Sequence, residues 1–379
     1  MKPSGSHTQL PQITPVTASP FTPFQLMLLS LMVMQNSSVV LLGRATQAGV
    51  DPEDKFNVKT LVALTEATKL AACFFLIGME NLVERFPPVR GAGYLPDLSV
   101  PGIIGALPAA IFEEISKVVA SPKNSLVVSP PAALYLFQNN ILYVALANLP
   151  APVFQVCYQS KLVTTAIVSV ILLNRQYAKL QWIALVCLGV GVALVVLGES
   201  SSEGEVKDIN LSVGLIAVAL ASLSSAFAGV WFEKVVKGVS AGANGGPAKT
   251  TSLWVRNVEL AFFSLVFASA YGAWESMMKA PEEAIDAPTK PFLHGFTFTT
   301  YILVLLQAGG GLLVAAIVKY ADNVVKGLAT GVAVVVSTTF SCMFLGTEVK
   351  MQFLLGGMII LVSVWTFSNH TKASSMLNC

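Results

Sequence analysis

The sequence predicts an all-α polytopic membrane protein in which ten transmembrane helices form two five-helix repeats. The first observation is composition: 54% of the residues are hydrophobic and 12% are charged, whereas an ordinary soluble domain carries about a quarter charged residues. The second is a series of ten apolar segments near the roughly 20 residues that cross a bilayer as a helix. The third is an internal echo, because 161–198 and 326–364 each open with lysine, break at a short polar turn and resume at glutamine.

The first five-helix half is expected to occupy 24–198. Residues 1–23 are rich in Pro, Ser, Thr and Gln and lack the regions of a cleavable signal, so they predict a disordered cytosolic tail. After the second span, proline-rich sequence surrounds the apolar segment 102–120, whose two glutamates and one lysine predict an interfacial helix; the alternative is an eleventh span. The spans of this half are 24–44, 58–80, 130–149, 152–174 and 180–198.

The second half is expected to occupy 212–369, between a linker at 199–211 and a short tail at 370–379. Ten spans place both termini on one side of the membrane. That side is the cytosol, because this choice puts more Lys and Arg in the cytosolic segments than in the opposite ones. The spans of this half are 212–234, 252–275, 298–319, 324–345 and 350–369.

Several classes of protein have no motif in this chain. The five cysteines and three histidines are scattered, which argues against a disulfide framework or a zinc site. Glycine-rich phosphate loops, nucleophile elbows and metalloprotease helices do not occur. We therefore expect no catalytic residues, metal or cofactor, and we expect membrane lipid but no nucleic acid as a partner.

Lys161 is the most informative residue, since it ends a stretch, 124–160, that carries no charge but several amides and phenols. An ammonium near the bilayer centre costs several kcal/mol even on lenient scales, so it faces a cavity, a partner or a ligand. Phe154, Tyr158, Lys161 and Thr165 recur at helical spacing and should share one face. The alternative is a bundle-interior lysine that a carboxylate neutralises.

Two further pairs of polar residues lie within expected spans. Glu66 and Lys69, three residues apart, can meet on one helical face and cancel much of their charge, so Lys69 is either structural or an anion contact. Arg256 and Asn257 lie one turn into their span, where Arg256 can snorkel to the interface. Asn257 is the better candidate for a binding site.

Lys319 and Lys326 bracket the turn between the eighth and ninth spans. They fit either a solvated corner or a gate that attracts a polyanion. Cations with aromatic rings and amides suit a phosphorylated nucleoside, because phosphates need cations and bases stack on rings. The residues therefore point to nucleotides as a class, without selecting one.

A set of longer motifs resembles a known family over about 58–368. In order they are EATK (66–69), QNN (138–140), ANLPAPVFQVCYQSK (147–161), LNRQYAKLQW (173–182), LSSAFAGVWFEKVVKG (223–238), SLWVRN (252–257) and QAGGGLLVAAIVKYADNVVKGLAT (307–330). They resemble the nucleotide-sugar transporters for UDP-galactose, UDP-N-acetylglucosamine and CMP-sialic acid, in the drug/metabolite transporter superfamily. The resemblance implies a ten-helix fold in the Golgi membrane that exchanges a cytosolic nucleotide sugar for lumenal nucleoside monophosphate.

The resemblance also implies the site. The expected substrate-binding residues are Lys69, Asn139, Asn140, Phe154, Tyr158, Lys161, Ser225, Asn257 and Lys319. The expected gate or supporting residues are Glu66, Gln155, Arg256 and Lys326. Phe154 stands where CMP-sialic acid carriers have Tyr and UDP-sugar carriers have Phe, and Ala261 stands where the sialic acid carriers have an aromatic residue. UDP-galactose or UDP-N-acetylglucosamine is therefore expected ahead of CMP-sialic acid.

Three other positions depart from the family pattern: Ser160 replaces Leu, Trp231 replaces Tyr, and Glu259 replaces Gln and is expected to pair with Arg256. Two rival functions remain open. One is export of metabolites or drugs within the same superfamily, and the other is a scaffold for glycosyltransferases without transport. A homodimer or an association with glycosyltransferases is also left open.

Overall fold

The computed structural model describes residues 22–46, 58–85, 122–149, 151–199, 210–238, 252–278, 293–345 and 351–376, together with residues 56, 108, 111–113, 116 and 291. Every regular element within these ranges is a helix. The expected tail at 1–23, the linker at 199–211 and the interfacial segment at 102–120 fall largely outside them. The last helix continues to Met376, into the expected short tail at 370–379.

The helices of the first half follow the expected order. They are α1 (Pro23–Ala45), α2 (Val58–Arg85), α4 (Pro122–Leu126), α5 (Ser129–Asn148), α6 (Ala151–Tyr158), α7 (Ser160–Leu173) and α8 (Lys179–Glu199). Prolines at the start of α5 fit positions where a backbone N–H has no helical partner. α7 ends at Asn174, whose left-handed backbone (φ 51°) directs its N–H to the carbonyl of Ser169.

The second half contributes five long helices. They are α9 (Leu211–Val236), α10 (Leu253–Met278), α11 (Phe298–Tyr320), α12 (Asn323–Leu345) and α13 (Met351–Met376). Asn210 caps α9 by accepting from the N–H of Val213, and Thr297 with Thr300 forms a capping box at α11. These caps satisfy N–H groups that have no partner inside the helix.

Nine helices within the described ranges are long and apolar enough to cross a membrane, so the polytopic all-α class is confirmed. α5, the expected third span, is not among them. It has 20 residues, but Gln138, Asn139 and Asn140 interrupt its apolar character. The exact ten-helix repeat stays a prediction.

The expected span 152–174 is not one continuous helix. It divides at Gln159, where the N–H of Gln159 bonds to the carbonyl of Val156 and the N–H of Leu162 bonds to that of Gln159. These three-residue bonds replace the four-residue bonds of an α-helix and tighten the chain locally. The chain therefore enters α7 through a break directly before Lys161.

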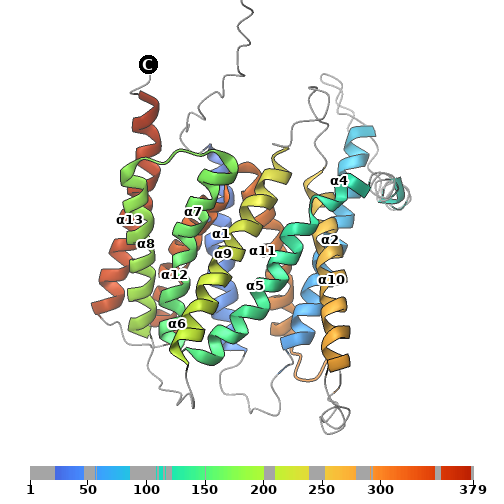
Figure 1. Ribbon diagram of the computed structural model, residues 1–379, viewed down its shortest axis with the longest axis horizontal. Coiled ribbons are helices and arrows are strands. Elements are labelled where there is room, and N and C mark those ends of the chain that lie inside the picture. The colour runs from blue at the N-terminus through green and yellow to red at the C-terminus, as the bar shows by residue number, and fades with distance from the viewer. Residues whose placement is uncertain are drawn as a thin grey trace, which may run out of the picture.

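The helices pack in a pattern that relates the two halves (Figure 1). α8 contacts α13 at one edge of the bundle and α2 contacts α10 at the other, while α1 contacts α11 and α12 just as α9 contacts α5 and α7. When the first five expected spans are exchanged with the last five, the α8–α13 and α2–α10 contacts map onto themselves. The contacts of α1 with α11 and α12 map onto those of α9 with α5 and α7. This is the packing that a duplicated five-helix unit would produce.

α8 and α13 approach each other closely at a pair of glycines. A Cβ added to Gly191 would lie 2.9 Å from the carbonyl oxygen of Gly356, and one added to Gly356 would lie 2.6 Å from that of Gly191. Only hydrogen at both positions allows the two backbones to touch in this way.

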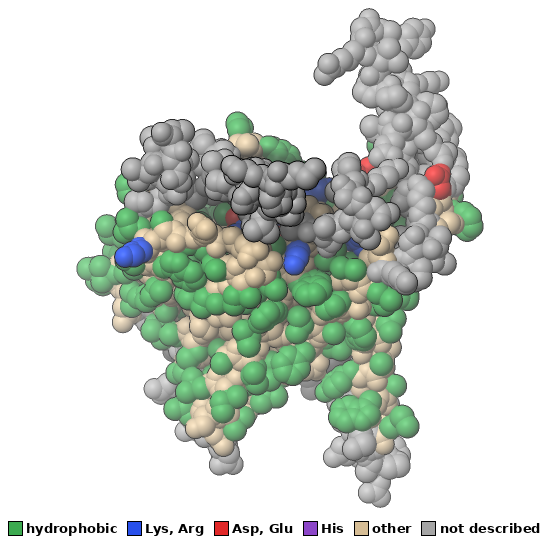
Figure 2. All heavy atoms as spheres, turned by 45° about the horizontal axis from the view of Figure 1, so that its top comes forward, with side chains coloured by type: hydrophobic (Ala, Val, Ile, Leu, Met, Phe, Trp, Pro, Cys, Tyr) green, Lys and Arg blue, Asp and Glu red, His purple; other side chains and the backbone are tan. Residues whose placement is uncertain are grey.

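Large apolar side chains cover the outside of the bundle. Leu31, Phe262, Leu305 and Trp365 are each at least half exposed, and Figure 2 shows hydrophobic side chains over most of the visible face, with the visible charged side chains toward one end. Exposed apolar surface of this extent suits contact with lipid. The interior also contains apolar side chains, together with the polar groups described next.

Candidate functional site

An aromatic and cationic cluster forms at the junction of α6 and α7. The rings of Phe154 and Tyr158 stack with centroids 5.6 Å apart and planes inclined by 13°, and Nζ of Lys161 lies 4.6 Å from the Tyr158 ring centroid. Nε2 of Gln138 on α5 donates to Oη of Tyr158 at 3.0 Å. Three of the four residues expected to share a face, Phe154, Tyr158 and Lys161, are therefore together, and Gln138 joins them.

The break at Gln159 positions this cluster. The rings belong to α6 and the ammonium to the first turn of α7. Oγ1 of Thr165 donates to the carbonyl of Lys161 at 2.6 Å. This group offers a ring face, an amide and a cation, which are the contacts that a nucleotide needs.

Glu66 and Lys69 meet on α2 as expected, with Nζ of Lys69 2.5 Å from Oε2 of Glu66. The Lys69 chain runs along α11, since a Cβ on Gly311 would lie 3.1 Å from Cδ of Lys69. The lysine is therefore partly neutralised and held against a neighbouring helix.

Three of the other expected binding residues, Asn140, Asn257 and Lys319, have contacts of their own, outside the cluster around Lys161. Asn140 and Asn257 donate to the carbonyls of Leu136 and Leu253 within their own helices, both at 2.9 Å. Asn139 is exposed, Ser225 is partly buried, and Nζ of Lys319 lies 5.4 Å from the Tyr320 ring centroid. Among the described residues, no hydrogen bond or ion pair joins these five to the cluster. The side chain of Gln155 lies outside what the structure describes.

The expected pairing of Arg256 with Glu259 is confirmed, with Nη1 of Arg256 2.8 Å from Oε2 of Glu259. Arg256 also donates to the carbonyl of Asn124 at 2.8 Å, and Oγ of Ser125 donates to Glu259 at 2.8 Å. The pair therefore ties α10 to α4, which is a packing role.

The two other positions that depart from the family pattern also make contacts between helices. Oγ of Ser160 lies 3.2 Å from that of Ser222 on α9. Nε1 of Trp231 donates to the carbonyl of Val127, ahead of α5, at 3.0 Å. Both contacts join the first half of the chain to α9, so these two residues take part in the packing between the first half and α9.

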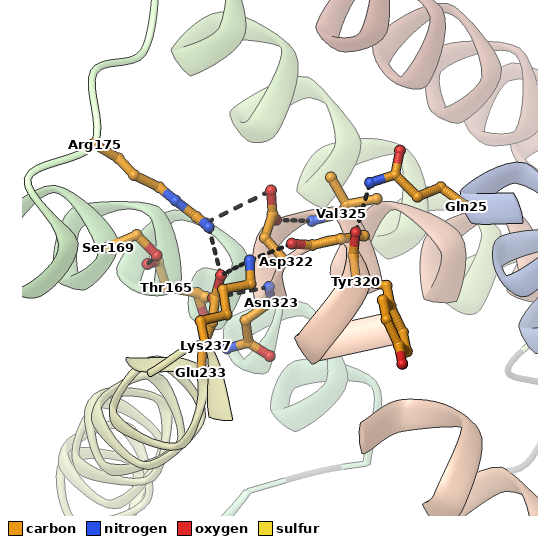
Figure 3. Close-up of polar contacts among 11 residues, drawn as sticks. Gln25, Thr165, Ser169, Arg175, Glu233, Lys237, Tyr320, Asp322, Asn323 and Val325 are labelled. Atoms are coloured by element: carbon orange, nitrogen blue, oxygen red, sulfur yellow. Dashed lines mark hydrogen bonds and ion pairs between the residues drawn. The ribbon is translucent and has the colours of Figure 1, made fainter. Parts of the chain in front are cut away.

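A second polar group, which the sequence analysis did not identify, centres on Glu233 near the end of α9 (Figure 3). Glu233 is fully buried. Its carboxylate forms an ion pair with Arg175 from the α7–α8 turn and another with Nζ of Lys237 at 2.7 Å. It also accepts from the backbone N–H of Asn323 at 3.1 Å.

Asp322 extends this group to the turn between α11 and α12. Its Oδ2 lies 3.6 Å from Nη1 of Arg175, and its Oδ1 accepts from the N–H of Val325 at 2.7 Å. Lys237 donates to the carbonyl of Ala321 in the same turn. Two carboxylates and two cations thus bind the α7–α8 turn, the end of α9 and the α11–α12 turn together.

The two carboxylates of this network favour the charged form of Arg175. Burial opposes the charge of Arg175, but Asp322 and Glu233 outweigh it and hold the pKa of Arg175 above its ordinary value. Burial, together with the Asp322 carboxylate, raises the pKa of the nearby Tyr177 phenol to about 12. The available sequence signal was a lone acid in the last turn of an apolar span, with lysine four residues later.

The comparisons with known proteins give the family. The model of the nucleotide-sugar transporter family matches residues 108–368. The chain is 36% identical to the Homo sapiens UDP-galactose translocator over 341 residues, covering 90% of this chain and 76% of that protein. It is 32% identical to the Rattus norvegicus UDP-N-acetylglucosamine transporter over 348 residues, covering 91% and 95%.

A third relative is the Caenorhabditis elegans UDP-N-acetylglucosamine/UDP-N-acetylgalactosamine transporter nstp-4, which is 35% identical over 360 residues, covering 92% of this chain and 95% of that protein. One solved crystal structure, 11% identical, superposes with a TM-score of 0.52 and covers 92% of this chain and 98% of the other, which shows a shared fold alone. The protein is a multi-pass transporter that belongs to the nucleotide-sugar transporter family.

Proposed function

We propose that the protein carries a UDP-sugar, UDP-galactose or UDP-N-acetylglucosamine, from the cytosol into the Golgi lumen in exchange for UMP. The observation that carries this proposal is the cluster of Phe154, Tyr158 and Lys161 at the helix break, with Gln138 beside it. Rings accept a base by stacking, and the ammonium accepts a phosphate. Relatives at 32–36% identity are named for UDP-sugars.

The direction of transport follows from the proposed orientation. Cytosolic termini agree with the excess of Lys and Arg in the segments placed there, and the Golgi location is what the family resemblance implies. Alternating access is supported by the contact pattern that exchanges the two halves, because such carriers rock one repeat against the other around a central site.

Obligatory exchange follows from the charge of the site. An empty carrier has Lys161 without a carboxylate partner among the described residues, and moving an uncompensated cation through the bundle is costly. A bound UDP-sugar or UMP supplies the missing negative charge. The loaded carrier should therefore reorient faster than the empty one.

Uptake into proteoliposomes tests the proposal. Purified protein is reconstituted, the vesicles are preloaded with UMP or with buffer, and the entry of labelled UDP-, GDP- and CMP-sugars is measured. We expect uptake of one UDP-sugar, stimulated by internal UMP. Lys161→Ala should abolish it, whereas Lys179→Ala, which removes an exposed lysine at the start of α8, should leave it unchanged.

Other outcomes would select a rival. Uptake of CMP-sialic acid would replace the substrate and keep the mechanism. Flux of an unrelated metabolite with no nucleotide competition would indicate an exporter, and nucleotide binding without flux would indicate a scaffold. Lys161→Ala with wild-type uptake would remove the role given to the cluster.

A further inference from the structure

We propose that Gln35 on α1 and Gln307 on α11 bind the sugar of the transported nucleotide sugar, and that this end of the site accepts an uncharged sugar. The inference rests on the proposed function and deepens it. The cluster around Lys161 accounts for the base and the phosphates but assigns no residue to the sugar. Neither glutamine is among the binding residues that the sequence predicts.

Gln307 lies on the face of α11 that points into the bundle. Each step along a helix turns by about 100°, so Leu305 and Gly309, two residues to either side, lie roughly opposite Gln307. Leu305 is 62% exposed, and no atom lies within 4 Å of a Cβ built on Gly309. Those two positions face outward, and Gln307, which is partly buried, therefore faces inward.

Two neighbouring helices bring polar side chains to the same turn of α11. Nε2 of Gln35 donates to the carbonyl of Leu306 at 3.0 Å, and a Cβ on Gly310 would overlap this amide. One residue further along, a Cβ on Gly311 would lie 3.1 Å from Cδ of Lys69 on α2. The inward-facing glutamine of α11 points between these two contacts, because its direction around the helix falls between theirs.

The two glutamines lie at a level between two apolar clusters. On α1, Gln35 lies between Met32, in one buried cluster, and Val39, which packs against another. α11 also passes from the second cluster to the first, with its glutamine between them. On α2, Thr65 follows Leu61 of the second cluster by one turn, and its buried hydroxyl has no hydrogen-bond partner among the described residues. Buried polar groups are costly without partners, so this polar layer indicates a ligand.

Both amides have hydrogen-bonding groups to spare. Among the described residues, no hydrogen bond reaches the side chain of Gln307, and the side chain of Gln35 makes only the bond to α11. A glutamine amide has two N–H donors and one carbonyl acceptor, so most of this capacity is left for a ligand. Sugar hydroxyls both donate and accept, and they match an amide on each count.

The charges beside this layer cancel. Glu66 and Lys69 pair with each other, and the two amides are neutral. A hexose or an N-acetylhexosamine fits such surroundings, whereas a sugar carboxylate would be buried without a cation of its own. The cluster around Lys161 differs, because its cation has no carboxylate partner among the described residues and suits the phosphates.

The two ends of the proposed site belong to different groups of helices. Phe154 and Tyr158 pack with residues of α5 and α9, whereas the apolar cluster beside the glutamines is formed by α1, α2 and α11 together with Phe56 and Phe296. A nucleotide sugar is an elongated ligand. With its base against the rings of α6, its sugar would reach the amides of α1 and α11.

Binding of sugar nucleotides and of UMP to the purified full-length protein tests the proposal. Gln35→Leu and Gln307→Leu nearly keep the side-chain size and remove the amides. The affinity for UDP-galactose or UDP-N-acetylglucosamine, whichever the wild type carries, should fall about 5- to 50-fold. UMP, which lacks the sugar, should bind both variants as it binds the wild type. Gln352→Leu, which changes an exposed amide near the start of α13, should match the wild type with every ligand.

A pair of ligands tests the charge of this end on the wild type. UDP-glucuronic acid differs from UDP-glucose in carrying a carboxylate at C6 of the sugar, and it should bind more weakly. Equal or tighter binding of UDP-glucuronic acid would overturn the inference that an uncharged sugar is accepted.

The results separate this inference from the proposed function. Wild-type protein that neither binds UMP nor takes up a UDP-sugar would refute the proposed function. Wild-type binding and uptake, with unchanged UDP-sugar affinity in Gln35→Leu and Gln307→Leu, would refute this inference alone. An equal loss of UMP and UDP-sugar affinity would give the two glutamines a structural role and would also overturn it.

Photocrosslinking of the unmodified protein covers the case in which the leucine variants do not fold. The probe is UDP-N-acetylglucosamine with a diazirine on its acyl group, and mass spectrometry locates the crosslinked peptides. Crosslinks should form in α1 and α11, and an excess of unlabelled UDP-sugar should suppress them. Suppressible crosslinks confined to other helices would overturn the proposal.

Discussion

Glu233→Gln should destabilise the protein by about 3 kcal/mol, because it removes the only charge that the fully buried Glu233 side chain offers to two cations. Breaking a buried ion pair by removing one partner costs roughly 3–5 kcal/mol. The lower end applies here for two reasons. Arg175 and Lys237 are 22% and 24% exposed and regain some hydration, and Arg175 keeps Asp322.

Thermal unfolding in detergent, followed by tryptophan fluorescence, measures this effect. At about 2 °C per kcal/mol, the low end for a large chain, the Tm should fall by about 6 °C. Glu66→Gln is the matched control, because Glu66 also pairs with a lysine but is 48% exposed. Because the Glu66 carboxylate is half exposed and pairs with one cation instead of two, the Tm of Glu66→Gln should fall by less than that of Glu233→Gln.

A double-mutant cycle isolates the interaction between Glu233 and Arg175. If the two groups stabilise each other, Arg175→Met with Glu233→Gln should be less destabilising than the sum of the two single changes. A Tm for Glu233→Gln within about 1 °C of the wild type, or a strictly additive double variant, would refute the reasoning.

Three further changes test other features. Gly229→Ala should lower the Tm, since its Cβ would lie 2.4 Å from Nδ2 of Asn323 and overpacking costs about 1–3 kcal/mol. Gly309→Ala is the control, because no atom lies within 4 Å of its Cβ, and its Tm should not change. Equal Tm values for the two variants would contradict the packing at Gly229. Gln138→Leu removes the donor to the cluster phenol and should reduce the initial rate of UDP-sugar uptake about 2- to 10-fold; an unchanged rate would show that this amide has no part in transport. Tyr177 ionises near pH 10 in the unfolded chain and near pH 12 when folded, so its contribution to stability is present below pH 10 and is lost as the pH rises to 12. Between pH 10 and pH 12 the Tm of Tyr177→Phe should therefore fall by less than the Tm of the wild type. Equal falls in Tm would count against a buried phenol.

Hydropathy and spacing predicted the membrane class and most helix positions because each depends on one segment at a time. They also brought Phe154, Tyr158 and Lys161 together, since the three lie within eight consecutive residues of one span. The break at Gln159 was missed, because no proline or glycine marks it in the sequence. α5 shows a different limit of hydropathy. It was expected as the third span, but the amides of Gln138, Asn139 and Asn140 lower its mean hydropathy, which is the property by which a span is recognised.

The site was harder to predict than the fold because it depends on which neighbour each helix faces. Gln138, Asn139 and Asn140 are adjacent, yet each step along a helix turns by about 100°, and only Gln138 contacts Tyr158. The network around Glu233 joins turns that are far apart in the sequence. Charges in such turns resemble solvated corners until packing shows that they meet.

The glycine contact between α8 and α13 constrains how this transporter can move. Because the carbonyl oxygen of each glycine lies where the other's side chain would begin, the two helices have no slack at this point and cannot slide toward one another. Side chains of Ile360 and Val195 also pack against the two glycines, so the contact is tight on both helices. We therefore expect α8 and α13 to stay together during a transport cycle. The helices at the opposite edge, where α2 meets α10, should then move further.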